Sequence, residues 1–190
     1  MKTLHDFDEI FDGQKVFRTL LEAMANPGRV LFIAQQSRKL YGDYAPFLAL
    51  AITLLDNEVT FCSCDNPELQ KDIPLLTLAE ETSVEEADYI FVSKPEQLSK
   101  VFEKAKMGTL ADPQKSATIL IRTDVAGDRK LTMYGSGIHR EITLCVSETV
   151  ETAVRLRDAQ AYEYPQGVDM IFVSENGEIL CIPRLVLQKM

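Results

Sequence analysis

Residues 89–92 read Tyr89-Ile90-Phe91-Val92, and residues 117–122 read Ala117-Thr118-Ile119-Leu120-Ile121-Arg122. In both stretches apolar side chains occupy consecutive positions, although neighbouring residues of a strand point to opposite faces of a sheet. Both faces of these two strands must therefore be buried, which is typical of a sheet that helices cover on each side. The sequence predicts an α/β fold, arranged as a three-layer α/β/α sandwich.

Helical and extended patterns alternate on either side of these two strands. Apolar residues three and four positions apart predict a helix over residues 13–25, with Asp12 as its N-cap. The further helices are expected over residues 45–55, 95–107 and 148–160, and the further strands over residues 30–34, 59–63, 131–134, 142–146, 170–173 and 179–182. The stretch that contains Pro67 and Pro74 is expected to be irregular.

Two glycine-containing turns predict hairpins, and therefore a mixed sheet. Ala126-Gly127-Asp128 is expected to fold residues 131–134 back onto residues 117–122, and Asn176-Gly177 is expected to join the last two strands. Gly135-Ser136-Gly137 interrupts the pattern and is interpreted as a bend that needs positive φ.

The composition excludes several classes of protein. Twenty basic residues against 29 acidic ones give a formal net charge of -9, so binding to the phosphate backbone of nucleic acids is not expected. The longest apolar run, residues 45–55, falls far short of the roughly 20 residues that span a bilayer. The acidic start of the sequence has no signal-peptide pattern. We expect one cytoplasmic domain over residues 1–190, without nucleic-acid or membrane partners.

The four cysteines, Cys62, Cys64, Cys145 and Cys181, match no zinc or iron–sulfur spacing. The nearest approach is the C-x-C pair Cys62 and Cys64, whose side chains point to the same face if residues 59–63 form a strand. The cysteines are interpreted as buried, reduced packing residues rather than as ligands.

No motif of an enzyme active site is present in the sequence. It contains neither the phosphate-binding string G-x-x-x-x-G-K-[ST] nor the G-x-S-x-G turn of a nucleophilic serine. Gly135-Ser136-Gly137 begins like a dinucleotide-binding loop, but His139-Arg140 stands where the third glycine is needed. The two histidines, His5 and His139, come from unrelated segments. No catalytic residue and no metal ligand is therefore assigned.

Four polar residues are candidates for binding an anion or a carboxylate. Arg18 lies beside the apolar stripe of the first helix, where a solvated surface role is the simpler one. His139 follows the glycine bend and either faces a cleft with the cation of Arg140 beside it or, the simpler alternative, lies on an ordinary surface loop. Asp169 either faces a pocket or ties a turn to the sheet through backbone amides. Arg184 stands at a strand end, where ligands and partners often bind. It either binds one of them or is an ordinary exposed surface residue.

Six segments of the chain form an ordered set of landmarks. They are Phe17-Arg18-Thr19-Leu20-Leu21-Glu22-Ala23-Met24-Ala25-Asn26-Pro27-Gly28, Leu54-Leu55-Asp56-Asn57-Glu58-Val59-Thr60-Phe61, Gly108-Thr109 with Pro113 and Ala117-Thr118, Gly135-Ser136-Gly137-Ile138, Pro165-Gln166-Gly167-Val168-Asp169, and Ile182-Pro183-Arg184. In this order and over this length, the set resembles the H-subunit family of the bacterial carbon–phosphorus lyase system. Ser136 departs from that family, which often has Pro or Ala at this position.

The resemblance implies a fold similar to the large domain of pyridoxal-phosphate-dependent transferases, without that cofactor, and a subunit that forms a homodimer. It implies a core complex with the G, I and J subunits, which works with the L subunit. In the family's system, ATP and methylphosphonate give α-D-ribose 1-methylphosphonate 5-triphosphate. Another subunit, with S-adenosylmethionine and an iron–sulfur cluster, then breaks the carbon–phosphorus bond. The H subunit itself is expected to bind no cofactor.

These expectations leave three hypotheses about function. The first, which we favour, is an accessory or scaffold subunit that phosphonate catabolism requires and that has no complete active site of its own. In the second, Arg18, His139, Asp169 and Arg184 form a cleft that binds the triphosphate or the phosphonate and contributes to the transfer. The third is a free-standing cytosolic α/β dimer that binds an acidic metabolite. Whether the chain is an enzyme by itself stays open.

Overall fold

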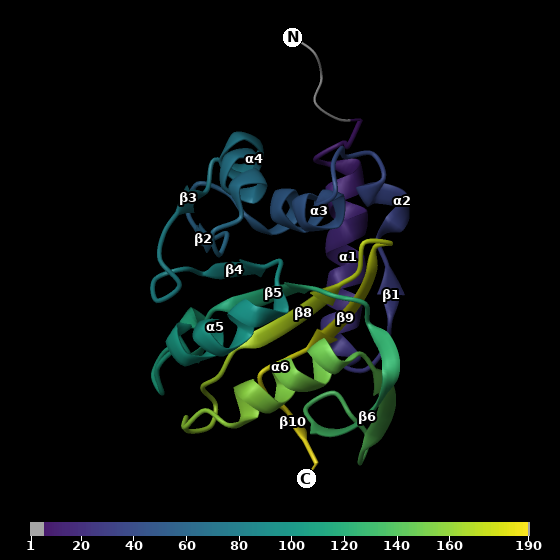
Figure 1. The fold of residues 1–190 in the computed structure, drawn as a ribbon, viewed down its shortest axis with the longest axis vertical. Coiled ribbons are helices and arrows are strands. Elements are labelled where there is room, and N and C mark those ends of the chain that lie inside the picture. Colours follow the sequence, from purple (N-terminus) through teal and green to yellow (C-terminus); the bar gives the residue numbers. More distant parts are fainter. Residues whose placement is uncertain (1–5, 190) are drawn as a thin grey trace.

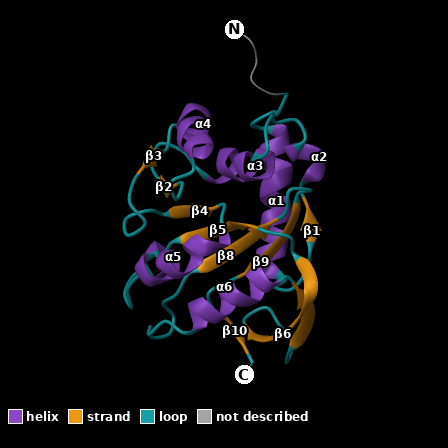
Figure 2. Cartoon of the chain, viewed as in Figure 1, coloured by secondary structure: helices purple, strands orange, loops and turns teal. Residues whose placement is uncertain are grey.

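The computed structural model describes residues 6–189 and contains two sheets (Figures 1 and 2). The larger sheet has seven strands in the order β1-β9-β8-β5-β4-β2-β3, and the smaller has three in the order β10-β6-β7. The strands are β1 (Leu31–Phe32), β2 (Thr60–Cys62), β3 (Glu80–Glu81), β4 (Tyr89–Val92), β5 (Thr118–Arg122), β6 (Ala126–Gly135), β7 (Ile142–Val146), β8 (Asp169–Val173), β9 (Glu178–Ile182) and β10 (Val186–Gln188). The helices are α1 (Phe11–Ala25), α2 (Ala34–Ser37), α3 (Ala45–Leu54), α4 (Pro67–Thr77), α5 (Leu98–Lys104) and α6 (Glu148–Asp158).

The large sheet is mixed, as the sequence predicts. Strands β3, β2, β4, β5 and β8 pair in parallel, whereas β9 is antiparallel to β8 and β1 is antiparallel to β9. The expected hairpin between β8 and β9 is confirmed, and Gly177 in its turn has a φ of 78°. The α/β class and the mixed sheet are therefore correct.

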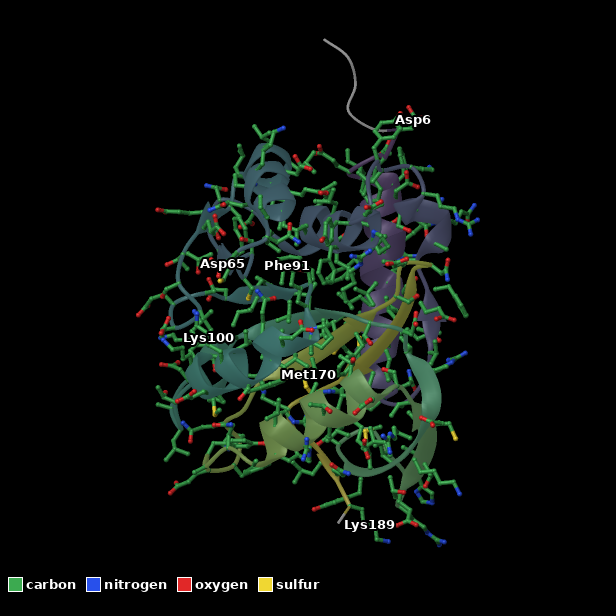
Figure 3. The ribbon with its side chains drawn as sticks, viewed as in Figure 1. Asp6, Asp65, Phe91, Lys100, Met170 and Lys189 are labelled. Carbon is green, nitrogen blue, oxygen red and sulfur yellow. The ribbon has the colours of Figure 1, made fainter. Side chains whose placement is uncertain are left out.

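Successive residues of the central strands belong to two different hydrophobic cores. Phe91 of β4 and Ile171 of β8 lie in one core, whereas their neighbours Ile90 and Met170 lie in the other. In Figure 3, Phe91 lies toward α3 and Met170 lies toward α6. The prediction that both faces of these strands are covered is confirmed, because the side chains on both faces are buried.

The two outer layers differ in composition. One core contains buried residues of α1, α3 and α4, and the other contains those of α5 and α6, so that helices cover both faces of the sheet (Figure 1). The second core also contains Leu131 and Met133 of β6 and Val186 of β10. The small sheet thus covers part of one face of the large sheet. The expected three-layer sandwich has only helices in its outer layers and so lacks this small sheet. Within residues 6–189, no helix is both long and apolar enough to cross a bilayer.

The predicted hairpin between residues 117–122 and 131–134 is wrong. Strand β5 pairs in parallel with β4 and β8, whereas β6 pairs with β7 and β10 in the small sheet. The patterns of the two strands explain the difference. β5 is apolar on both faces and fits the centre of the large sheet, whereas β6 buries alternate residues and keeps one face toward solvent.

The stretch with two prolines is helical rather than irregular. Asn66 caps α4, because its side-chain oxygen accepts hydrogen bonds from the backbone N–H groups of Glu68 and Leu69. Pro67 occupies the first turn, where a missing N–H costs nothing. Pro74 lies inside the helix, which packing of Leu69 and Ile73 in the core maintains.

The predicted cap of the first helix is also wrong. Asp8, four residues before Asp12, accepts hydrogen bonds from the N–H groups of Ile10 and Phe11. Asp12 is buried in the first turn and accepts from Lys39 Nζ at 2.7 Å. The burial of Asp12 opposes its ionisation, but the hydrogen bond with Lys39 prevails and lowers the pKa of this carboxyl group. The helix itself is otherwise as predicted, but its expected apolar stripe of Phe17, Leu20, Leu21 and Met24 is only partly buried. Val16, Leu20 and Ala23 form the buried face, and Phe17 and Leu21 are exposed.

A buried arginine attaches the last strand, which the sequence does not predict. Arg157 of α6 has no exposed side-chain surface, and its guanidinium donates to the backbone oxygens of Pro183 and Val186. Its Nε donates to Asp158 Oδ1 at 2.8 Å, and Asp158 Oδ2 accepts from the N–H of Gln188 at 2.8 Å. Arg157 and Asp158 together hold β10 against the helix.

We predict that Arg157→Met lowers the free energy of unfolding by about 3 kcal/mol, since buried acceptors and a carboxylate lose their charged donor. Urea unfolding followed by circular dichroism measures this change. Arg155→Met on the exposed side of α6 is the matched control and should stay within about 0.5 kcal/mol of the wild type. Equal stability of the two variants would contradict the role assigned to Arg157.

Candidate functional site

Asp169 and Arg184 meet at one edge of the large sheet. The carboxylate oxygen Oδ1 of Asp169 accepts a hydrogen bond from the backbone N–H of Arg184 at 2.8 Å. The guanidinium of Arg184 donates to the backbone oxygen of Pro113 and, at 2.8 Å, to Ser116 Oγ. Asp169 therefore ties a turn to the sheet, the simpler of its two predicted roles, and Arg184 holds the loop that precedes β5.

Further contacts at this edge join the landmark segments of Asp169 and Pro113. Gln166 Nε2 donates to the backbone oxygen of Gly108 at 3.0 Å, and the N–H of Gly167 donates to the oxygen of Met107 at 3.0 Å. A Cβ on Gly108 would lie 2.7 Å from the oxygen of Pro113, which leaves no space for a side chain. The loops at the amino ends of β5 and β8 are thus locked to one another and to the end of β9.

His139 lies where two other landmark segments touch. A Cβ on Gly137 would lie 2.8 Å from Pro27 Cδ, so the glycine bend packs directly against the end of α1. The expected positive φ of this bend is confirmed at Gly135 and Gly137, with values of 132° and 83°. The two segments enclose an open hollow of about 400 Å³ that Arg29 and His139 help to line.

Arg18 and His139 do not join the cluster of Asp169 and Arg184. Arg18 is exposed on α1, roughly 12 Å along the helix axis from the hollow at 1.5 Å per residue. Within the described residues 6–189, no hydrogen bond or ion pair links Arg18 or His139 to Asp169 or Arg184. His5 lies outside the described residues.

A hollow of about 580 Å³ lies at the carboxyl ends of β5 and β8, where Arg122 and Glu175 face it. Arg122 Nη2 donates to Glu175 Oε1 at 2.6 Å, and its guanidinium lies 4.7 Å from the centre of the Tyr44 ring. The positive charge of Arg122 is therefore already compensated inside the chain.

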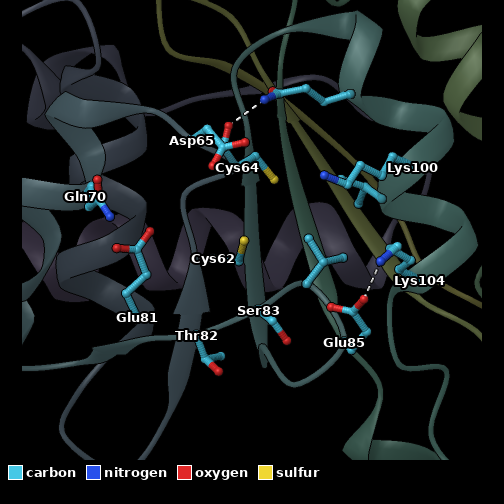
Figure 4. A pocket seen from close by; sticks show the side chains of 13 residues that line it. Cys62, Cys64, Asp65, Gln70, Glu81, Thr82, Ser83, Glu85, Lys100 and Lys104 are labelled. Carbon is cyan, nitrogen blue, oxygen red and sulfur yellow. Dashed lines mark hydrogen bonds and ion pairs between the residues drawn. The ribbon is translucent and has the colours of Figure 1, made fainter.

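A second cleft, of about 480 Å³, opens at the carboxyl ends of β2 and β3 (Figure 4). Ligands of open α/β sheets bind at this end of the strands. Cys62 and Cys64 line the cleft beside Glu81, and Lys100 of α5 lies across from them. This cleft contains none of the four residues predicted to bind a ligand, although two cysteines two residues apart at the end of a predicted strand are a signal for it.

Three of the four cysteines are buried and reduced, as predicted, but Cys145 is exposed because it lies on the outward face of β7. In the cleft, the thiol of Cys64 donates a hydrogen bond to the sulfur of Cys62, and the backbone N–H of Cys64 adds a second. These bonds outweigh burial and lower the pKa of Cys62 to about 7, while the same contact raises the pKa of Cys64. Burial raises the pKa of Cys181. Among residues 6–189, no group of three or more His, Cys, Asp and Glu side chains is arranged for a metal ion.

Comparison with known proteins decides the family. The model of the bacterial phosphonate metabolism protein PhnH matches residues 5–187. The chain belongs to the PhnH family. Over 186 residues it is 25% identical to the α-D-ribose 1-methylphosphonate 5-triphosphate synthase subunit PhnH of Rhizobium meliloti, covering 93% of this chain and 90% of the relative. It is 29% identical over 174 residues to the putative C-P lyase subunit protein HtxG of Stutzerimonas stutzeri, covering 90% of this chain and 83% of that relative.

The landmarks that resemble the PhnH family position backbone in this structure. Gly108, Gly137 and Gly167 stand where backbones or side chains approach closely, and Asp169 and Arg184 bind loop backbone. The cleft with Cys62 and Cys64 lies outside all six landmark segments.

We predict that Gly137→Ala destabilises this PhnH-family chain by about 1–3 kcal/mol more than Gly42→Ala does. Both glycines have positive φ, 83° and 90°, so the backbone strain of the two variants is similar. They differ in space, because a Cβ on Gly137 meets Pro27 whereas none of the described atoms lies within 4 Å of a Cβ on Gly42. Thermal and urea unfolding of both variants measure the difference, and equal losses would contradict the packing of the bend on α1.

Proposed function

We propose that the chain is an accessory subunit of a carbon–phosphorus lyase complex and that phosphonate catabolism requires it. The observation that carries this proposal is the PhnH family match over residues 5–187, together with two relatives that are both named as subunits. The reaction served is the formation of α-D-ribose 1-methylphosphonate 5-triphosphate from ATP and methylphosphonate. In it, the phosphonate displaces the purine from the ribose.

The structure supports a scaffold role in a specific way. Three of the landmark residues, Gln166, Asp169 and Arg184, fix loops at the amino edge of the sheet through hydrogen bonds within the chain. A rigid edge of this kind suits a surface that other subunits recognise, because little conformational entropy is lost on docking.

The finer parts of the proposal concern partners and location. We place the chain in the cytoplasm, as a homodimer that joins the G, I and J subunits and works with the L subunit. It would bind no cofactor, with S-adenosylmethionine and the iron–sulfur cluster on another subunit. Its sheet and helices would share the plan of the large domain of pyridoxal-phosphate transferases.

We assign contact with the other subunits of the complex to the exposed side of α1. Phe17 and Leu21, one helical turn apart, are 48% and 58% exposed, and Ile10 and Phe11 at the start of the helix are 75% and 67% exposed. Such a group of apolar side chains on one element is typical of an interaction surface. The relatives' names as subunits supply the occupant, a neighbouring subunit with an apolar surface of its own.

We predict that the double variant Phe17→Ser/Leu21→Ser weakens assembly with the co-expressed G, I and J subunits at least about tenfold, since central apolar contacts contribute most of the affinity of an interface. Affinity purification followed by size-exclusion chromatography measures assembly. Leu75→Ser on α4 is the matched control, because Leu75 is 66% exposed. If the double variant assembles like the wild type and Leu75→Ser, α1 is not the docking surface.

The second hypothesis, a cleft that contributes to transfer, requires Asp169 and Arg184 to contact substrate. We predict instead that the isolated chain releases no adenine from ATP and methylphosphonate. We also predict that Arg184→Met in the assembled complex either blocks assembly or leaves turnover per complex unchanged, because Arg184 holds the loop of Pro113. Adenine release by chromatography, normalised to assembled complex, measures this. An intact complex with turnover reduced about tenfold or more would favour the catalytic cleft.

A further inference from the structure

The cleft at the carboxyl ends of β2 and β3 holds two thiols that the proposed function does not use. Cys62 ends β2, and Cys64 follows two residues later with a φ of 50°, a backbone conformation that is rare outside glycine. Both sulfurs face the cleft in Figure 4. We propose that this pair is a modification site at which Cys62 exchanges with a low-molecular-weight disulfide and Cys64 then closes an internal disulfide.

Cys62 and Cys64 differ from the other two cysteines because they line the cleft. Cys62 and Cys64 are each 7% exposed, but they line a space of about 480 Å³ that gives a small disulfide access. Cys181 is 0% exposed inside the opposite core and is inert by burial. Cys145 is exposed on β7, well outside the cleft, and the residues that line the cleft include no other cysteine.

The contacts of Cys62 activate it as the attacking thiol. The hydrogen bond from the Cys64 thiol and that from the Cys64 N–H stabilise the Cys62 thiolate, against burial and the charges of Glu81 and Asp65. The lowered pKa increases the thiolate fraction of Cys62 at neutral pH, and the thiolate is the form that attacks disulfides. In Figure 4 the amino group of Lys100 points toward the thiols, and its charge favours the ionised form of Cys64.

The chemistry proceeds in two balanced steps. The Cys62 thiolate attacks one sulfur of a disulfide R–S–S–R, which forms a mixed disulfide on Cys62 and releases R–S⁻. Cys64 then transfers its proton to solvent or to R–S⁻ and attacks the sulfur of Cys62, which forms the Cys62–Cys64 disulfide and releases the second R–S⁻. In total the pair loses two electrons and two protons, and one R–S–S–R becomes two R–SH.

The first step prepares the second. The largest cause that raises the pKa of Cys64 is its hydrogen bond to Cys62, followed by burial and by the charge of Cys62. Once Cys62 carries the substituent R–S, that negative acceptor no longer exists. Cys64 is then more easily deprotonated, with Lys100 facing it, and the same contact that activates Cys62 in the dithiol no longer restrains Cys64.

The walls of the cleft indicate which disulfides fit. Lys100 forms no ion pair with any residue in 6–189, and so it is available for a carboxylate of the ligand. Gln97 donates through Nε2 to the backbone oxygen of Cys64 at 2.5 Å, whereas its buried Oε1 has no partner among the described residues. A peptide-like disulfide with carboxylates, such as glutathione disulfide, offers the group that Lys100 can bind.

The test uses the full chain with Cys145→Ser, which removes the exposed thiol. The chain is incubated with glutathione disulfide at pH 7, and intact mass and peptide mapping follow the products. We expect the segment with Cys62 and Cys64 to lose the mass of two hydrogen atoms, with two glutathione thiols released per chain and Cys181 unmodified. In Cys64→Ser on the same background, we expect the reaction to stop at a glutathione adduct on Cys62.

Two results would overturn the proposal. One is a folded Cys145→Ser chain in which Cys62 reacts no faster than Cys181. The other is a folded Cys64→Ser variant without an adduct on Cys62, with folding checked by circular dichroism. If Cys64→Ser does not fold, the mapping of the Cys145→Ser chain decides by itself. Its initial rate should reach half its maximum below the pH range of an ordinary thiol, and a rate that rises only above about pH 8.5 also counts against the pair.

Discussion

Burial of both faces of the central parallel strands is the constraint on which this structure depends. Phe91, Leu120 and Ile171 face α1, α3 and α4, whereas their neighbours along each strand face α5, α6 and the small sheet. Each such side chain contributes roughly 1.5–3 kcal/mol by leaving water. A shift of one residue in the register of β5 would exchange its two sets of side chains between cores of different shape, so the pairing of β4, β5 and β8 is fixed.

This constraint gives the two edges of the sheet different roles. Because all five parallel strands point the same way, their amino ends and carboxyl ends lie at opposite edges. The amino edge of β5 and β8 is filled by loops that bind one another through Gly108, Gln166 and Arg184. The carboxyl edge of β2 and β3 keeps an open cleft with thiols, acids and lysines. The locked loops and the open cleft thus lie at opposite edges of the sheet.

Sequence reasoning succeeded where one local pattern determines the structure. The doubly apolar strands, the existence of helix α1 and the Asn176-Gly177 turn each follow from neighbouring residues. It failed where distant segments compete. Ala126-Gly127-Asp128 looks like a hairpin turn in the sequence, but in the structure these residues begin β6, whose partners β7 and β10 lie farther along the chain. Pro67 and Pro74 indicate an irregular stretch until Asn66 is recognised as a cap.

For the candidate site residues, the sequence indicated positions along the chain but not their partners in space. Asp169 and Arg184 were recognisable from their positions at strand ends, and the structure brings them together, but their partners are loop backbone that a sequence pattern cannot identify. Arg18 and His139 do not join this pair. The sequence could not show this, because spacing along the chain does not determine which loops approach one another. The C-x-C spacing of Cys62 and Cys64 is visible in the sequence. Its proposed function depends on the cleft, which forms only when β3 and α5 pack around the end of β2.

A family resemblance of this kind therefore identifies a fold more directly than a site. The six landmark segments include positions where a glycine, a short polar link or an arginine is needed to close loops against the sheet, and those requirements hold for any protein built on this plan. None of the six contains Cys62 or Cys64. The landmark contacts thus account for the locked amino edge of the sheet, and the proposed thiol chemistry lies at the open carboxyl edge, where it does not disturb those contacts.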